Sequence, residues 1–288
     1  MEYLGRTPAP PLDQFVERIW YCSDAPAHAR ETVLPSGGSL GLAINLVEEE
    51  FQIYDPDNPG SVRAHAGALV CGTYTRSYVY DPRQRAAVIG VHFRPGGAFP
   101  FLGISPAEIT DTHVPLDDLW GSGGRNLREQ LLEGGSPGER LRLVEAVLMR
   151  RLRRAPQTRQ THPAVTVAVD ALREGGNGAR VAAVAAAVGL SRRRFAEVFE
   201  RDVGLTPKLY ARLQRFHHVK QQLATLGGPR SWATFAVECG YFDQSHLLRD
   251  FVEFSGMSPT NYLLGQANET RLDHVVHAYP RTPGASPA

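Results

Sequence analysis

Residues 191–210 have the sequence SRRRFAEVFERDVGLTPKLY, and residues 243–262 repeat its pattern as DQSHLLRDFVEFSGMSPTNY. Corresponding residues lie 52 positions apart: Ser191 and Asp243, Phe199 and Phe251, Gly204 and Gly256, Pro207 and Pro259, Tyr210 and Tyr262. A repeat of this size indicates one supersecondary unit used twice. Because the agreement holds at one offset from Ser191 to Tyr210, we take the region from Val181 to Tyr262 as the one that decides the fold.

Each copy is predicted to be a helix-turn-helix. The first helices carry apolar residues at helical spacing: Val181, Val184, Ala185 and Val188 in one copy, and Trp232, Phe235, Ala236 and Cys239 in the other. A glycine, Gly189 or Gly240, then ends the helix, since glycine readily adopts a positive φ. Ser191 or Asp243 follows as the N-cap of the second helix, where a side-chain oxygen accepts a backbone N–H bond.

The second helices, residues 191–202 and 243–254, are each predicted to have an inner and an outer face. The inner faces hold Phe195, Val198, Phe199 and Asp202 in one copy and Leu247, Phe251 and Phe254 in the other. The outer faces hold Arg193 and Glu197, and Ser245 and Arg249. A helix of this kind reaches base edges in the major groove with its N-terminal and outer side chains. Arginine can bond guanine there, and glutamate can accept from cytosine.

The segment between the copies is predicted to be one helix that sets their separation. Residues 206–226 contain Pro207 at a first-turn position, a periodic apolar pattern and no internal breaker. A helix of about 20 residues is roughly 30 Å long. Because successive major grooves on one side of B-DNA lie about 34 Å apart, one chain could place both second helices on a single duplex.

The region from about His162 to Leu264 resembles the DNA-binding domain of the AraC/XylS family of bacterial transcription regulators. The strings GLSRRRFAEVFERDVGLTPKLY and GYFDQSHLLRDFVEFSGMSPTNY carry the resemblance. It implies these base-reading positions: Arg193, Ala196, Glu197, Gln244, Ser245, His246 and Arg249. Ala196 departs from the longer polar residue often found at its position, so direct readout by the first helix is expected to be thin. Weaker contacts to the DNA backbone are expected from Ser191, Arg192, Arg194 and Arg230.

Composition places the chain among two-domain globular proteins. It has 288 residues, of which 42% are hydrophobic and 21% charged. Cys22, Cys71 and Cys239 are widely scattered, which favours buried thiols in a reducing compartment over a disulfide framework or a zinc site. No signal peptide or membrane span is predicted. Residues 1–115 carry 8 Arg and Lys against 13 Asp and Glu, whereas residues 156–265 carry 13 against 9, a basic balance that fits phosphate contact.

The N-terminal half is predicted to be mainly β, as a barrel or sandwich with short helices. A short helix is expected over residues 11–20, and strands over residues 32–34, 40–47, 51–54, 68–71, 77–80 and 86–93. The strings LPSGG, GVHFRPGGAFPFLG and VPLDDLWG resemble an uncharacterised N-terminal domain found on many AraC-type regulators. The expected organisation is a β-rich sensor or regulatory domain (residues 1–115), its helical extension (116–154), a linker (155–163), an all-α double helix-turn-helix domain (164–265) and a mobile tail (266–288).

These features predict a sequence-specific regulator that binds double-stranded DNA and has no catalytic activity or cofactor. The resemblance implies a cytoplasmic bacterial protein of a family that includes activators, with RNA polymerase as a further partner; the sign of regulation and the choice between monomer and homodimer stay open. A second hypothesis adds a small-molecule effector bound by the N-terminal domain. A third, less favoured, is a metal-dependent cupin enzyme fused to the DNA-binding domain. His65, His92 and His113 stand too far apart in the sequence for the cupin motif, so no metal site is expected.

Overall fold

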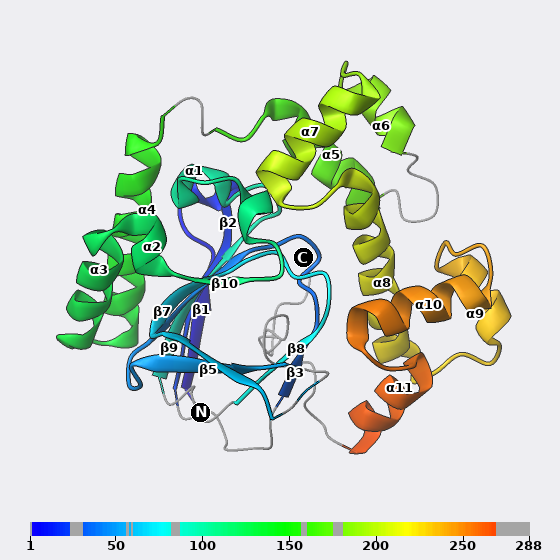
Figure 1. Cartoon of the computed structure of the whole chain (residues 1–288), viewed down its shortest axis with the longest axis horizontal. Coiled ribbons are helices and arrows are strands. Elements are labelled where there is room, and N and C mark those ends of the chain that lie inside the picture. The colour runs from blue at the N-terminus through cyan, green and yellow to red at the C-terminus, as the bar shows by residue number, and fades with distance from the viewer. Residues whose placement is uncertain are drawn as a thin grey trace, which may run out of the picture.

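The N-terminal domain contains two antiparallel sheets (Figure 1). The structure is a computed structural model and describes residues 2–23, 31–55, 58, 60–81, 87–156, 160–174 and 181–268. The larger sheet has the order β1 (Glu2–Arg6), β2 (Val16–Ser23), β9 (Ala87–Phe93), β4 (Gly41–Asn45), β7 (Ala68–Cys71), β10 (His113–Pro115). The smaller sheet has the order β3 (Glu31–Val33), β8 (Tyr78–Tyr80), β5 (Glu50–Tyr54), β6 (Val62–Ala66).

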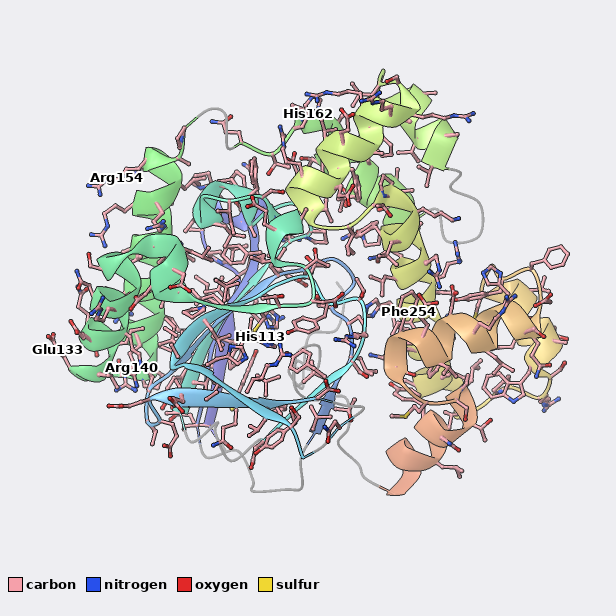
Figure 2. The ribbon with its side chains drawn as sticks, in the orientation of Figure 1. His113, Glu133, Arg140, Arg154, His162 and Phe254 are labelled. Carbon is pink, nitrogen blue, oxygen red and sulfur yellow. The ribbon has the colours of Figure 1, made fainter. Side chains whose placement is uncertain are left out.

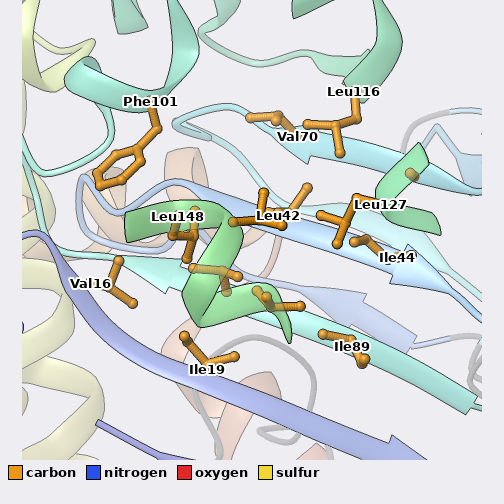
Figure 3. Packing of buried hydrophobic residues seen from close by; sticks show 14 of the residues in the cluster. Val16, Ile19, Leu42, Ile44, Val70, Ile89, Phe101, Leu116, Leu127 and Leu148 are labelled. Carbon is orange, nitrogen blue, oxygen red and sulfur yellow. The ribbon is translucent and has the colours of Figure 1, made fainter. Parts of the chain in front are cut away.

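The larger sheet has two different faces because side chains alternate along each strand. Leu42, Ile44, Ile89 and Val91 pack in the main core of the domain (Figure 3). Helices on this side contribute further residues to the core: α1 (Phe99–Leu102), α2 (Leu116–Trp120), α3 (Ser122–Leu132) and α4 (Pro137–Arg154). The opposite face, with Ala43 and Val88, looks toward the smaller sheet. The leucine and valine stripe of α4 is therefore a core face of its own domain.

The helix predicted over residues 11–20 is wrong. The structure has a 3₁₀ turn, η1 (Leu12–Gln14), followed by β2, which pairs with β1 on one side and β9 on the other. Leu12, Val16 and Ile19 are all buried, and their spacing fits one helix face as well as a turn followed by a strand. The β-branched and aromatic residues Val16, Ile19 and Tyr21 suit a strand with a neighbour on each edge.

The other predicted strands are present, with ends that differ by one or two residues. β1, β6 and β10 were not predicted. Of these, β6 has the sequence VRAHA and is mostly exposed, so it carries little of the apolar alternation that marks a strand. The Arg94–Gly97 segment forms a turn.

The C-terminal domain is all-helical. Its helices are α5 (Pro163–Glu174), α6 (Val181–Ala187), α7 (Arg192–Val203), α8 (Pro207–Leu226), α9 (Trp232–Glu238), α10 (Gln244–Ser255) and α11 (Pro259–Asn268). Buried residues from all these helices share one core. The predicted α8 is confirmed as a helix of 20 residues, although Leu226 at its end is exposed. Residues 269–288 of the predicted tail and 157–159 of the predicted linker lie outside the described residues.

The two domains are in direct contact through the C-terminal end of α7 (Figure 1). This end lies against η3 (Pro106–Ile109), where the Ser105 Oγ donates to the Arg201 carbonyl at 2.8 Å and the Thr110 Oγ1 donates to the Gly204 carbonyl at 2.7 Å. Gln214 of α8 donates to the Gly37 carbonyl at 2.7 Å. The contact leaves the N-terminal ends of α7 and α10 on the side away from the N-terminal domain (Figure 1).

Candidate nucleic-acid interface

Both predicted helix-turn-helix motifs are present. In the first, the turn after α6 contains Gly189, whose φ is +71°, and the Ser191 Oγ accepts a bond from the Arg194 N–H at 3.2 Å. In the second, the turn after α9 contains Gly240, whose φ is +83°, and an Asp243 carboxylate oxygen accepts from the His246 N–H at 2.7 Å. The sequence-predicted turns and N-caps are thereby confirmed.

The inner faces of both second helices lie in one core. Phe195, Phe199, Phe251 and Phe254 are each no more than 1% exposed. Tyr210 of α8 contacts Phe199 of the first motif, with ring centroids 5.4 Å apart, and Phe216 of α8 contacts Phe251 of the second motif at 5.1 Å. Because a close-packed core deforms little, α8 and its aromatic contacts fix how the two motifs are held.

The inward carboxylates have structural partners. Asp202 is fully buried and accepts bonds from the His162 N–H at 2.7 Å and the Arg201 Nε at 2.5 Å. Asp250 is also buried, and Arg212 of α8 donates to it at 2.7 Å. Arg212 also pairs with Glu253 at 2.6 Å and so attaches α10 to α8. Apart from the bond between the neighbours Arg201 and Asp202, the bonded residues are 38 or more positions apart, so no local sequence pattern predicted these bonds.

The outer face of α7 is exposed and its charged residues are paired with one another. The Arg193 side chain is 91% exposed, and its Nε lies 2.9 Å from Glu197. Arg194 lies 3.5 Å from the other oxygen of the same carboxylate. The hydrogen bond from Arg193 is the main reason that the pKa of Glu197 is below its usual value. Since exposed pairs of this kind are worth at most about 1 kcal/mol, base contacts could replace them at small cost. Ala196 is half-buried beside them.

The outer face of α10 presents Ser245 and Arg249, both exposed. The Arg249 Nε donates to the Ser245 carbonyl at 3.4 Å, and within the described part of the chain no carboxylate pairs with this guanidinium. Gln244 and His246 are half-buried. The His246 ring packs against Tyr241, with centroids 5.2 Å apart, and its Nε2 lies 4.0 Å from Asp250. Arg249 is therefore better placed than His246 to reach a ligand.

The four residues expected at the DNA backbone are all exposed: Ser191, Arg192, Arg194 and Arg230. Ser191 already serves as the N-cap of α7. Arg230 lies directly before Ser231, the N-cap of α9. Their placement near helix N-termini brings positive charge and free backbone N–H groups together, which suits phosphate oxygens.

One exposed aromatic residue at this face was missed. The two motifs correspond at an offset of 51 up to the turn glycines and of 52 from the N-caps onward, so the second turn has one additional residue. Buried Tyr241 takes the place of Leu190, which leaves Phe242 as the insertion, and Phe242 is 87% exposed directly before the N-cap of α10. The change of offset was visible in the sequence and could have identified it.

A separate cavity of about 100 Å³ lies between the two sheets of the N-terminal domain. Aromatic side chains form much of its wall: Trp20, Phe51, Tyr74, Tyr78 and Tyr80. The described residues that line it include neither a carboxylate nor a lysine or arginine. Cys71 also lines it, and burial raises the pKa of this thiol to about 12.

The histidines of this region are closer together than their sequence separation indicated. The His65 and His113 rings, from neighbouring β6 and β10, have centroids 5.2 Å apart, and the Tyr74 hydroxyl lies 2.5 Å from the His113 Nδ1. Figure 2 shows His113 among the side chains between the sheets. Burial, with a smaller effect of His65, lowers the pKa of His113 to about 3. Within the described residues no group of three His, Cys, Asp or Glu side chains is placed to hold a metal.

Family comparison assigns both halves of the chain. Residues 184–264 match a helix-turn-helix domain of the AraC type, and residues 5–115 match a domain of unknown function, DUF6597. The C-terminal match identifies residues 184–264 as a helix-turn-helix domain of the AraC type. The chain is two-domain, with a β-rich N-terminal region and a helical C-terminal region, as the sequence predicted.

Solved structures of ToxT from Vibrio cholerae resemble this chain over most of its length. An apo variant of ToxT is 10% identical, with a TM-score of 0.44 over 92% of this chain and 97% of ToxT. ToxT bound to an unsaturated fatty acid is 9% identical, with a TM-score of 0.42 over 91% of this chain and 95% of ToxT. No curated protein matches the sequence. Within the described part of the chain, no helix has both the length and the apolar character needed to cross a membrane.

Proposed function

We propose that this DNA-binding transcription regulator reads two successive major grooves of one duplex with α7 and α10. The observation that carries the proposal is that both helices expose a polar outer face while their inner faces share one core. The 20 residues of α8 correspond to roughly 30 Å, close to the groove repeat of about 34 Å. A rigid spacer of that length suits two adjacent sites on the same side of DNA.

Within this proposal the outer residues have two roles. Arg193, Glu197, Ser245 and Arg249 would contact base edges, with Gln244, His246 and Ala196 beside them. Ser191, Arg192, Arg194 and Arg230 would contact phosphates, which supply most of the affinity and its dependence on salt. Contact with RNA polymerase, activation in a bacterial cytoplasm and the oligomeric state stay predictions of the family resemblance.

The test compares two arginines of different proposed role. DNA selected from a random pool by the chain should contain two elements about 10 base pairs apart, centre to centre. Arg249→Ala should weaken binding to that DNA by about 1–3 kcal/mol and leave binding to random DNA nearly unchanged. Both affinities are measured by fluorescence anisotropy.

Arg192→Ala is the matched control. Loss of a phosphate contact should weaken selected and random DNA alike and reduce the salt slope by about one. If Arg249→Ala also weakens the two DNAs equally, Arg249 contacts phosphate and its base-reading role is wrong. If the selected DNA contains one short element only, reading of two grooves is wrong.

A second function rests on the cavity: the N-terminal domain binds a small effector. The absence of charged groups among its described lining residues, together with its aromatic wall, favours an uncharged apolar ligand. Its volume of about 100 Å³ limits the ligand to about one ring, since a cavity of about 150 Å³ holds benzene.

The effector is tested by thermal shift of the full chain with single-ring compounds in matched uncharged and carboxylate forms. The uncharged forms should raise the melting temperature and the carboxylates should not. Ala43→Leu fills the cavity and should abolish the shift. Ala146→Leu, on an exposed position of α4, is the control and should retain it. Stabilisation of the Ala43→Leu chain by the same compound would place the ligand elsewhere.

The proposal includes no catalytic step. The Cys71 thiol is kept protonated by burial, and a protonated thiol is a poor nucleophile. His113 is held neutral and engaged with Tyr74. These states suit a binding site better than a reacting one.

A further inference from the structure

One short segment of the N-terminal domain bonds to both DNA-reading helices. Residues 72–77, the bridging segment, join β7 of the larger sheet to β8 of the smaller sheet. Near one end, the Thr73 Oγ1 donates to the Val203 carbonyl of α7 at 3.1 Å. At the other end, the Ser77 Oγ donates to the Ser255 carbonyl of α10 at 3.4 Å. Both hydroxyl residues are buried, Thr73 fully and Ser77 with 5% exposed.

The two carbonyls occupy the same position in the repeat. Val203 and Ser255 lie 52 residues apart, and each is the last residue of its helix. The C-cap glycines that follow are also close to the bridging segment. A Cβ on Gly204 would lie 3.0 Å from the Thr73 Oγ1, and a Cβ on Gly256 would lie 3.5 Å from the Ser77 Oγ. The N-terminal domain therefore contacts equivalent points on both helices through residues only four positions apart.

The bridging segment is itself held firmly by its own domain. The Thr75 N–H and Oγ1 donate to the two carboxylate oxygens of Asp111 at 2.7 and 2.6 Å. The Gly72 N–H donates to the Thr112 carbonyl at 2.9 Å, and a Cβ on Gly72 would lie only 1.7 Å from the Ile109 carbonyl oxygen. Four residues span at most about 14 Å. The segment is thus a short, anchored link between the C-terminal ends of the two helices.

We propose that Thr73 and Ser77 are positioning residues that set the separation and relative orientation of α7 and α10, and so determine which spacing between two DNA elements the chain accepts. The inference rests on the proposed reading of two grooves. The helices are joined through α8 in any case; the bridging segment adds a second, independent connection that closes a ring. With two connections instead of one, α7 and α10 can no longer rotate relative to each other about α8, because their C-terminal ends are both hydrogen-bonded to the bridging segment.

The same segment connects the wall of the cavity to the C-terminal ends of α7 and α10. Tyr74 and Tyr78, each adjacent in sequence to one of the two hydroxyl residues, line the cavity. The segment also crosses between the two sheets that enclose it. A molecule bound in the cavity would therefore contact the segment that carries both hydroxyl residues.

The experiment measures spacing preference and not affinity alone. DNA selected by the unmodified chain is rebuilt as a series in which the two elements are moved apart or together by one to four base pairs, and a further DNA carries one element. In the Thr73→Val, Ser77→Ala double variant, the ratio of affinity for the best spacing to that for spacings two base pairs away should fall by about fivefold or more, since each lost bond is worth about twofold to tenfold. Affinity for the single element should stay unchanged.

Two control variants make the result specific. Thr73→Ser with Ser77→Thr keeps both hydroxyls and should keep the spacing preference. Ser105→Ala removes a bond to α7 and the N-cap of η3 but no bond to α10, and it should also keep the spacing preference. An unchanged spacing preference in the Thr73→Val, Ser77→Ala variant overturns the proposal. The proposal is also overturned if the Thr73→Ser, Ser77→Thr variant loses as much of the spacing preference as the Thr73→Val, Ser77→Ala variant does. If the unmodified chain binds one element as tightly as two, the proposed two-groove function has failed, and this inference fails with it.

Discussion

Among single residues, His113 ties the stability of the N-terminal domain to pH. Burial lowers the pKa of His113 to about 3, against about 6.5 in an unfolded chain. Below pH 6.5 the unfolded chain binds a proton that the folded chain does not, so stability is present above pH 6.5 and falls as pH drops toward 3. Between pH 7 and pH 5.5 this residue should account for a loss of about 1 kcal/mol in the free energy of unfolding.

Urea unfolding at the two pH values tests this. The His113→Gln variant keeps a polar partner for Tyr74. Its free energy of unfolding should fall by about 1 kcal/mol less than that of the parent between pH 7 and pH 5.5. His218→Gln, in α8 and outside the N-terminal sheets, should lose as much stability as the parent. If His113→Gln shows the parent's full acid sensitivity, the histidine is not the responsible group.

The outward residues of the candidate site were largely predictable, and their partners were not. Helical periodicity alone placed Arg193 and Arg249 outward. The Arg193–Glu197 pair also follows from i,i+4 spacing, although both residues were predicted only as contacts to DNA bases. The bonds of Thr73 and Ser77 depend on how two domains pack, and neither residue has a pattern around it that reveals this.

At the level of elements, α10 should have one face that stabilises the fold and one that contributes little to stability. Phe251 is 1% exposed and packs against Phe216, whereas the next residue, Val252, is 46% exposed. Phe251→Ala should reduce the free energy of unfolding by about 3–5 kcal/mol. Val252→Ala should change it by less than about 0.5 kcal/mol. Thermal and urea denaturation measure both, and equal effects would mean that α10 does not pack as described.

Elements with strong local signals were predictable, whereas those defined by distant neighbours were not. The ends of α7, α8 and α10 followed from caps and periodicity, because those signals act within a few residues. β2 was mistaken for a helix because Leu12, Val16 and Ile19 satisfy both periods, and only its pairing with β1 and β9 decides the matter. The apolar cavity also escaped prediction, since it lies between strands of two different sheets.

Over the whole molecule, the charge and the contacts of the two domains fit a regulator whose halves act together. The basic half holds the exposed arginines, and the acidic half contacts the C-terminal ends of α7 and α10, away from those arginines. Binding to DNA and contact between domains therefore use opposite ends of the same helices. A change in the N-terminal domain can then alter the placement of α7 and α10 without competing with DNA for the same surface.

This arrangement predicts that the two domains unfold together, with Gly38 as a point where they can be separated. Gly38 has a φ of +93°, and a Cβ there would lie 2.7 Å from the Tyr210 ring of α8. Gly38→Ala should therefore force the domains apart and turn a single calorimetric transition into two. Gly134→Ala is the matched control: its φ is +115°, but a Cβ would meet nothing within 4 Å. It should lose about 1–2 kcal/mol from backbone strain and keep one transition. If both variants keep one transition, contact at Gly38 does not join the domains; if the parent already shows two, the domains are not coupled in stability.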